Sequence, residues 1–322
     1  LVTGGYGFIG SNFVLAEVAK GNRIINLDKL TYAANKDNLK TIHGHKLYSF
    51  VETDIANKAA VADVFANNQI DALVNFAAES HVDNSIHAPS EFIQTNIFGV
   101  FNLLECARHY HAQNQNFRFL HVSTDEVYGS LPKDGSVFTE GSQYRPNSPY
   151  SASKAASDHL VRAWNKTYGL PTITTNCSNN YGPMQHGEKL IPKIIANCLA
   201  QKPIPIYGTG ENVRDWIYVK DHTTGIALAL DKGRVGETYC FGGNAELTNN
   251  EVVQTICNVM DTVRPRIKGK YADLITYVAD RKGHDLRYAI DDSKARRELG
   301  FATYADFKTR ITETISWYLE RL

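Results

Sequence analysis

A glycine-rich segment at the start of the chain constrains the fold more than any other feature. Gly4, Gly7 and Gly10 lie in the run from Thr3 to Ser11, between a strand pattern and a helical pattern. Glycines at this spacing allow a tight turn and let the backbone approach a pyrophosphate, which the free amides of the helix start attract. Asp28 closes the next predicted strand, at the position of an acid that binds an adenosine ribose. A carboxylate there repels a 2′-phosphate, so the sequence predicts a dinucleotide-binding fold that prefers NAD to NADP.

The first half of the chain alternates short β-branched runs with longer helical patterns, which is typical of βαβ units in a doubly wound parallel sheet. The predicted strands cover residues 1–3, 23–27, 47–52, 72–76, 117–123 and 172–176, and the predicted helices cover 9–19, 58–67 and 91–110. Because residue 1 falls inside the first strand pattern and is not Met, we expect that strand to be seen only in part.

The rhythm changes after Cys177, where loops rich in Gly, Pro and Asn separate helices predicted at 189–200, 221–230, 249–261 and 304–320. Thr248 and Glu251 form a capping box at one helix start. The expected fold class is therefore α/β, with a doubly wound Rossmann domain and a smaller mixed α/β substrate lobe around a shared cleft. We assign residues 1–176 and a return segment of about 213–240 to the first, and residues 177–212 and 241–322 to the second.

Composition excludes several classes of function. The chain has 34 basic and 34 acidic side chains, so no cationic excess indicates a nucleic-acid or membrane partner. No apolar stretch approaches the roughly 18 residues that span a bilayer, and no signal segment opens the chain, so we expect a cytoplasmic protein. The five cysteines include no C-x-x-C pair, which predicts buried free thiols and no metal site.

Three pairs match the spacing Tyr-x-x-x-Lys: Tyr32 with Lys36, Tyr150 with Lys154, and Tyr304 with Lys308. Residues four apart share a helix face, where the Lys cation favours an ionised phenol. Only Tyr150 follows a Ser-Pro helix start, which places it in the first turn and predicts a phenol pKa lowered by the dipole and by Lys154. We interpret Tyr32 as a loop residue and Tyr304 as the start of a terminal helix.

Asp125 and Glu126 lie within the run from His121 to Gly129, where a strand passes into a turn at the ligand-binding edge of such sheets. Adjacent strand residues face opposite ways, so both acids reach one site only if the chain leaves β geometry after Thr124. If they converge, repulsion and burial should raise the pKa of one of them. The alternative is a pair of solvated turn carboxylates. Asp54, after the third strand, can either meet an adenine edge or cap a turn.

Over essentially its whole length the sequence resembles the extended short-chain dehydrogenases/reductases, and within them the dTDP-glucose 4,6-dehydratase family. The matching segments are residues 3–11, 27–33, 77–83, 123–129, 150–154, 178–183, 214–219 and 280–285. The Thr-Asp-Glu run at 124–126 is the discriminating one, because related epimerases have no Asp-Glu pair there.

The resemblance implies a lyase that turns dTDP-glucose into dTDP-4-keto-6-deoxyglucose and water through an internal NAD cycle, with NAD as a bound catalyst. Tyr150, helped by Thr124 and Lys154, takes the proton of the sugar 4-hydroxyl while C4 is oxidised. Glu126 then removes the C5 proton, protonated Asp125 donates to the departing 6-hydroxyl, and the hydride returns to C6.

The resemblance also assigns binding residues. Those expected near NAD are Gly4, Gly7, Phe8, Ile9, Gly10, Asp28, Lys29, Leu30, Thr31, Asp54, Ile55, Ala77, Ala78, Thr95, Tyr150, Lys154 and Asn180. Those expected near the nucleotide sugar are Ser80, Thr124, Asn179, Lys189, Leu190, Pro205, Tyr207, Arg214, Asn249, Arg281 and His284. Lys189, Arg214 and Arg281 are the cations suited to a diphosphate.

Two segments depart from the family pattern: Ala34 replaces the usual Gly, and residues 184–187 lack the usual aromatic and Pro. The family implies a homodimer through helices at 91–110 and 150–168, although the apolar stripe there also suits ordinary core packing. Three functional alternatives stay open at this point. They are a nucleotide-sugar 4-epimerase, which needs the Tyr without the acids, a dehydratase of another nucleotide sugar, and a non-catalytic NAD sensor.

Overall fold

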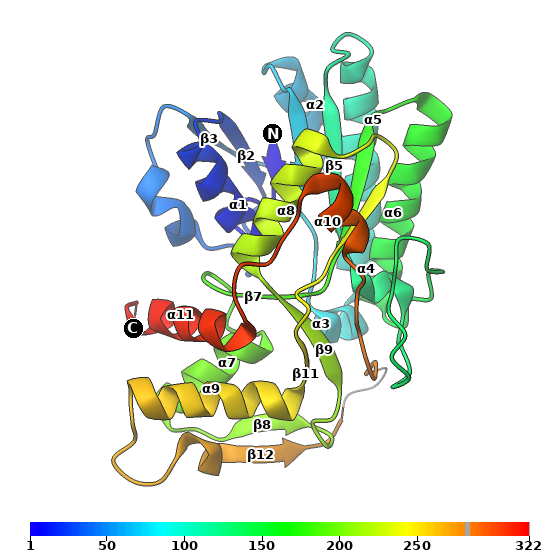
Figure 1. Cartoon of the computed structure of the whole chain (residues 1–322). Coiled ribbons are helices and arrows are strands. Elements are labelled where there is room, and N and C mark those ends of the chain that lie inside the picture. Colours follow the sequence, from blue (N-terminus) through cyan, green and yellow to red (C-terminus); the bar gives the residue numbers. More distant parts are fainter. Residues whose placement is uncertain (281–283, 322) are drawn as a thin grey trace.

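A seven-stranded parallel sheet forms the larger part of the molecule in the computed structural model, which describes residues 1–280 and 284–321 (Figure 1). Its strand order is β10-β6-β5-β4-β1-β2-β3. The strands are β1 (Val2–Thr3), β2 (Ile24–Asp28), β3 (Tyr48–Glu52), β4 (Ala72–Asn75), β5 (Arg118–Thr124), β6 (Thr172–Cys177) and β10 (Thr238–Phe241). The order reverses direction between β1 and β4, which is where a doubly wound sheet opens a ligand crevice. The predicted fold class and the six predicted strands are confirmed.

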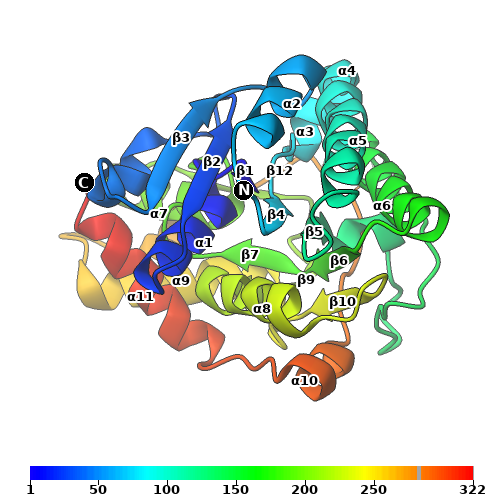
Figure 2. The same cartoon turned by 90° about the horizontal axis from the view of Figure 1, so that it is seen from above.

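Helices cover both faces of this sheet (Figure 2). On one face lie α1 (Phe8–Ala19), α8 (Val219–Lys232) and α10 (Ser293–Leu299), whose apolar side chains pack with those of the sheet. On the other lie α2 (Lys58–Ala66), α5 (Val100–His111) and α6 (Pro149–Tyr168). Because both faces are covered, β2, β5 and β6 are buried along nearly all of their length.

The second lobe lies beside the carboxyl ends of the large sheet (Figure 1). It contains a three-stranded sheet of β7 (Asn179–Tyr181), β9 (Val213–Tyr218) and β11 (Glu246–Thr248), and a two-stranded sheet of β8 (Ile204–Tyr207) and β12 (Ile275–Val278). Its helices are α7 (Leu190–Ala200), α9 (Asn249–Val263) and α11 (Phe307–Leu319). The predicted capping box of Thr248 and Glu251 is confirmed at the start of α9.

Two segments divide between the lobes differently from the sequence-based boundaries. Strand β9 opens the predicted return segment but pairs with β7 and β11 rather than with the large sheet. The sequence-based boundaries place α10 in the small lobe, whereas Ala295 and Leu299 pack in the core of the large sheet together with side chains of α8. The chain thus crosses back to the large sheet a second time, a path that local patterns do not encode.

The predicted helix at 91–110 is three elements: α4 (Pro89–Phe92), a π-helical stretch (Ile93–Gly99) and α5. Such π-helical turns are rare and occur frequently at functional sites. This one buries Thr95 and Asn96. Within it, Ile93 and Phe98 are exposed by 41% and 53%, so the predicted apolar stripe is only partly buried in this chain.

The predicted start of the terminal helix at Tyr304 is wrong. Helix α11 begins at Phe307, because the Asp306 side chain caps it by accepting a hydrogen bond from the Thr309 amide.

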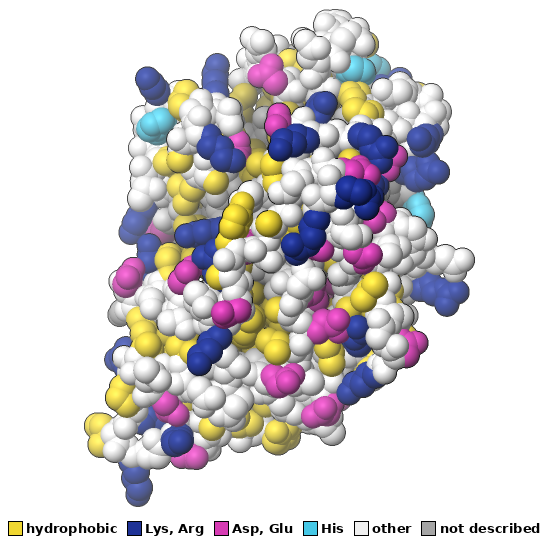
Figure 3. All heavy atoms as spheres, viewed as in Figure 1, with side chains coloured by type: hydrophobic (Ala, Val, Ile, Leu, Met, Phe, Trp, Pro, Cys, Tyr) yellow, Lys and Arg dark blue, Asp and Glu magenta, His cyan; other side chains and the backbone are white. Residues whose placement is uncertain are grey.

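None of the described helices is long and apolar enough to cross a membrane. Basic and acidic side chains are mixed over the face drawn in Figure 3.

Candidate active site

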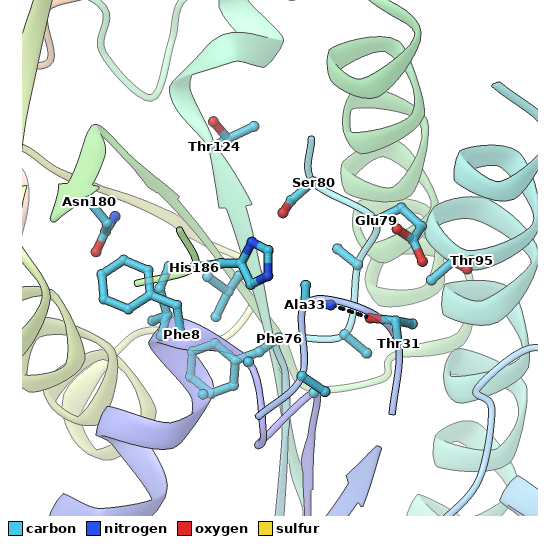
Figure 4. Close-up of a pocket in the computed structure, with 18 of the residues that line it drawn as sticks. Phe8, Thr31, Ala33, Phe76, Glu79, Ser80, Thr95, Thr124, Asn180 and His186 are labelled. Atoms are coloured by element: carbon cyan, nitrogen blue, oxygen red, sulfur yellow. Dashed lines mark hydrogen bonds between the residues drawn. The ribbon is translucent and has the colours of Figure 1, made fainter. Parts of the chain in front are cut away.

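A cavity of about 290 Å³ opens at the carboxyl ends of the large sheet. Its walls come from the loops that follow β1 to β6 and from residues 185–189 of the second lobe. Figure 4 shows Phe8 and Phe76 on one side, Ser80, Glu79 and Thr95 on another, and His186 between them. The shared cleft expected from the sequence is therefore present, at the switch point of the sheet.

The glycine loop forms one end of the cavity. Helix α1 begins at Phe8, and its N-cap Gly7 provides no side-chain hydrogen bond, so the first amides of the helix stay available to a ligand. Gly4 has a φ of +70°, and a Cβ on Gly10 would lie 2.3 Å from the Gly4 carbonyl oxygen. The loop thus needs these glycines, and its amides and dipole suit a pyrophosphate.

Asp28 fixes this loop to the end of β2. Its carboxylate oxygens accept hydrogen bonds from the amides of Tyr6 (2.9 Å) and Leu30 (2.8 Å). Burial raises the pKa of Asp28, and these two amides oppose the shift. Beside it, Lys29 Nζ lies 3.6 Å from carboxylate oxygens of both Asp54 and Glu79. Asp54 both lines the cavity and accepts from the Ala56 amide, so it is a turn acid placed at a ligand site.

Asp125 and Glu126 both line the cavity, because the chain leaves β geometry where the sequence requires it. Strand β5 ends at Thr124, and a 3-10 turn (Asp125–Tyr128) follows, capped by a hydrogen bond from the Glu126 amide to the Thr124 hydroxyl (3.3 Å). Burial, then the adjacent Glu126, raise the pKa of Asp125 well above 3.8. One buried oxygen of Asp125 has no hydrogen-bond partner, so it is available to a substrate hydroxyl. The alternative of two solvated carboxylates is excluded.

Tyr150 and Lys154 lie on α6, which starts as predicted with Ser148 as N-cap and Pro149 in the first turn. Asn96 of the π-helical stretch braces this turn: its amide nitrogen donates to Ser153 Oγ (2.9 Å), and Ser153 Oγ donates to the Tyr150 carbonyl (2.7 Å). The tyrosine ring packs edge-on against Phe92. The phenol is therefore held on a rigid helix turn.

The predicted lowering of the Tyr150 pKa is wrong. Burial, then Glu126, raise the pKa of Tyr150 well above 10, although its contact with the Thr124 hydroxyl opposes this. Lys154 is not among the groups that most affect this pKa; its Nζ donates to the Val122 carbonyl (2.9 Å) and lies 3.3 Å from His121 Nε2. The four-residue spacing places Tyr150 and Lys154 on the same face of α6, but it does not determine the position of Lys154 Nζ.

The structure brings most of the predicted site residues to this cavity. Lining it are Gly4, Gly7, Phe8, Ile9, Gly10, Asp28, Lys29, Thr31, Asp54, Ile55, Ala77, Ala78, Ser80, Thr95, Thr124, Asp125, Glu126, Tyr150, Lys154, Asn179, Asn180 and Lys189. The residues that do not line it are Leu30, Leu190, Pro205, Tyr207, Arg214, Asn249 and His284, although Arg214 is close enough to lower the pKa of Asp125 against its other neighbours. Arg281 is outside the described residues.

Among the predicted diphosphate cations, Lys189 lines the cavity and donates to the Ser80 carbonyl (3.0 Å). Arg214 is buried on β9, where it donates to the carbonyls of Val213 and Asp285 and stacks on the Tyr288 ring. His284 lies 2.7 Å from an Asp280 oxygen. Within the described ranges, no group of three His, Cys, Asp or Glu side chains could hold a metal.

Several cavity residues escaped the sequence reasoning. His186 lies in the segment that departs from the family pattern, and its ring is edge-on to that of Tyr32, with 5.7 Å between the ring centroids. Glu79 and Phe76 follow β4, and Cys177 ends β6. Their position after parallel strands is the signal that could have found Glu79 and Phe76. No local signal indicates that residues 184–188 reach across to the first lobe.

Comparisons with known proteins agree with this geometry. Residues 1–314 match the family model described as GDP-mannose 4,6 dehydratase. The chain is 56% identical, over 99% of its length and 92% of the relative, to a dTDP-glucose 4,6-dehydratase of Xanthomonas campestris pv. campestris. A crystal structure of such an enzyme from Streptomyces venezuelae with NAD bound superposes with a TM-score of 0.91 at 45% identity, covering 99% of this chain and 96% of that one. A Thermus thermophilus UDP-glucose 4-epimerase with NAD gives 0.89 at 27% identity, covering 100% and 99%.

Proposed function

The chain belongs to the dTDP-glucose 4,6-dehydratases, within the family of GDP-mannose 4,6-dehydratases, and we propose that the cavity residues carry out the dehydration in the roles given below. The enzyme converts dTDP-glucose into dTDP-4-keto-6-deoxyglucose and water with NAD as its cofactor. The observation that carries the proposed roles is the capped turn after Thr124, which places a protonated carboxyl and a second carboxylate side by side.

The residues present suit NAD. In this proposal the amides of Gly7, Phe8 and Ile9 bind its phosphates, Asp28 to Thr31 hold the adenosine ribose, and Asp54 and Ile55 border the adenine. Ala77, Ala78, Thr95, Lys154 and Asn180 line the remainder of the cofactor site. When bound, NAD supplies a reversible store for the two electrons taken from C4.

Gly10→Ala is expected to weaken NAD binding by about 10-fold or more, which corresponds to about 1.4 kcal/mol. The added Cβ would lie 2.3 Å from the Gly4 oxygen and 2.9 Å from the Gly5 Cα, and these backbone atoms cannot rotate away. Calorimetric titration with NAD, after removal of any bound NAD from the protein, measures the affinity. Gly141→Ala is the matched control, because its Cβ would meet only Thr139 Oγ1 at 3.7 Å. Equal affinity in both variants would contradict the assigned role of the loop.

Tyr150 and Thr124 are proposed to act on the sugar 4-hydroxyl. Their side chains contact one another in the cavity, so Thr124 can hold the hydroxyl while Tyr150 takes its proton. The raised pKa of the phenol means that it needs a nearby cation before it can act as a base. Lys154 is the cation that this chain places on the same helix face.

Asp125 and Glu126 are proposed to act on C5 and C6. A carboxyl with a raised pKa keeps its proton at neutral pH, so Asp125 is suited to donate to the departing 6-hydroxyl. Glu126 then serves as the base at C5. Ser80, Asn179 and Lys189 line the same cavity and are the proposed contacts to the nucleotide sugar, with Leu190, Pro205, Tyr207, Arg214, Asn249, Arg281 and His284 proposed for its more distant parts.

Incubation of the purified protein with dTDP-glucose in heavy water, without added reductant, tests this function. Loss of one water from the sugar with one deuteron at C5 is the expected result. Conversion to dTDP-galactose at unchanged mass would make the protein a 4-epimerase instead. No reaction would direct the test to other nucleotide sugars, and failure with these would favour a non-catalytic NAD sensor.

A homodimer and a cytoplasmic location remain proposals. The exposed apolar side chains Ile86, Ile93 and Phe98 lie on α3 (Val82–His87) and the π-helical stretch, next to α5, and offer a surface for a second copy. Sedimentation equilibrium measures the oligomeric state. We expect the wild type to be a dimer and Phe98→Asp to be a monomer.

A further inference from the structure

A buried polar cluster lies behind Lys154, outside the cavity lining. His121 on β5 is fully buried, and Ser157 and Asp158, both on α6, are exposed by 0% and 4%. None of the three lines the cavity. Burying an imidazole and a carboxylate beside a lysine is unfavourable unless each group is paired, so the cluster calls for a physical explanation.

Hydrogen bonds determine which nitrogen of His121 carries the proton. The Thr3 hydroxyl accepts from the Ala77 amide (3.3 Å) and donates to Asn75 Oδ1 (2.5 Å), so the Asn75 amide nitrogen faces His121 Nδ1 at 3.1 Å. The Asn75 amide nitrogen can only donate, so Nδ1 accepts and the neutral ring carries its hydrogen on Nε2. This N–H can donate to Ser157 Oγ (3.3 Å), whose own hydrogen goes to the Lys154 carbonyl, but it cannot accept from the Lys154 ammonium. Burial, then Lys154, lower the pKa of His121 to about 4, and the ring is neutral at pH 7.

Asp158 supplies the negative charge of the cluster. Its Oδ2 accepts from Ser123 Oγ (2.8 Å), the Tyr144 hydroxyl (2.9 Å) and the Asn176 amide nitrogen (3.4 Å). These donors all bond Oδ2, whereas the buried Oδ1 has no hydrogen-bond partner. Asp158 Oδ1 and Lys154 Nζ, at 3.4 Å and 3.3 Å, both lie beside the same imidazole nitrogen of His121, Nε2.

We propose that Asp158 is a positioning residue, which holds the Lys154 side chain charged one helical turn from Tyr150, with the neutral His121 ring packed against Lys154 Nζ; this rests on the dehydratase function proposed above. Asp158 follows Lys154 by one helical turn, and Lys154 Nζ is anchored on its other side by the Val122 carbonyl. The groups that face Lys154 are His121 from β5, Asp158 from α6 and the Cys177 thiol from β6.

Lys154 stays protonated at neutral pH with the help of the nearby Asp158 carboxylate. Burial lowers the pKa of Lys154, and Asp158 is the main group that opposes the shift. Tyr150 faces Glu126, Asp125 and Cys177, all of which raise its pKa. A neutral lysine would leave the phenol with no cation to favour its ionised form, so the first step would fail at the pH where Lys154 loses its proton.

The test compares kcat/KM for dTDP-glucose against pH in wild type, Asp158→Asn and Tyr144→Phe. Asp158→Asn removes the charge and keeps the shape, so the alkaline limb of its profile is expected about 1 pH unit or more below that of the wild type. Tyr144→Phe removes one hydrogen-bond donor to the same carboxylate without changing any charge. The alkaline limb of its kcat/KM profile is therefore expected at the same pH as in the wild type. His121→Gln exchanges one neutral group for another, so it should lower kcat and leave the limb in place.

Urea unfolding provides a readout that does not depend on activity. The native state of Asp158→Asn must hold a charged, unpaired lysine at neutral pH but not above the lowered pKa of Lys154. Its destabilisation relative to wild type should therefore shrink between about pH 7 and about pH 9.5, whereas that of Tyr144→Phe should stay constant.

An unmoved alkaline limb in Asp158→Asn, or the same shift in Tyr144→Phe, would overturn the proposal. If Asp158→Asn does not fold, Asp158→Glu is the variant to measure, because it keeps the negative charge. It is expected to lower kcat without changing the pH of the alkaline limb. A change in the pH of that limb would contradict the proposal. Absence of dehydration in the wild type would instead refute the proposed function itself.

Discussion

Tyr150→Phe is expected to lower kcat by about 10²- to 10⁴-fold, the usual contribution of a general acid or base. The substitution deletes only the phenol oxygen beside Thr124 and retains the ring that packs edge-on against Phe92, so the fold should persist. Because the first step then fails, no 4-keto sugar should form. Quenching with borodeuteride, which labels a 4-ketone at C4, is expected to find no deuterium on the recovered sugar.

Tyr304→Phe is the matched control for this experiment. Tyr304 precedes Lys308 by the same spacing, but its side chain is 69% exposed and lies outside α11. Its kcat should equal that of the wild type. A Tyr150→Phe enzyme that keeps activity within about a factor of three of wild type would refute Tyr150 as the base, since such a factor is far below general-base catalysis.

Glu126→Gln is expected to reduce dehydration by about 10²- to 10⁴-fold while the first oxidation continues. Glu126 is one of the groups that raise the pKa of Tyr150, so its loss of charge eases the ionisation of the phenol. The sugar should then accumulate as a 4-ketone without solvent deuterium at C5. Borodeuteride trapping after reaction in heavy water distinguishes this outcome from that of Tyr150→Phe.

Asp125→Asn is the companion variant, because it should slow the loss of water but still permit exchange at C5. It also has a predictable effect on stability. The raised pKa of Asp125 means that the native state retains a proton which the unfolded chain releases. Protonation of Asp125 therefore stabilises the wild-type native state at low pH, and this stabilisation is lost as pH rises through the native pKa of Asp125. The stability of Asp125→Asn relative to wild type should thus be greater at about pH 8 than at about pH 4. If both acid variants lacked C5 exchange, the separate roles of Asp125 and Glu126 would be wrong.

Local sequence patterns predicted six of the strands in the large sheet and their order along the chain. Glycine spacing, the acid at Asp28 and alternating apolar runs are local or short-range signals, and each reports a backbone requirement that has few solutions. The same is true of the demand that the chain leave β geometry at Thr124, which follows from the alternation of side chains along a strand. The helix start at Ser148 and the capping box at Thr248 are likewise local.

The positions of long side-chain ends and the contacts between distant segments depend on packing in the folded chain. Lys154 is four residues from Tyr150 in sequence, but its nitrogen turns to Val122 and His121 because burial demands partners there. Helix α10 returns to the large sheet, and His186 crosses the cleft to Tyr32, through packing between segments that share no local pattern. The charge states of Tyr150 and Asp125 depend on burial and on neighbours brought together by the fold, and desolvation is a property of the assembled interior that no spacing rule contains.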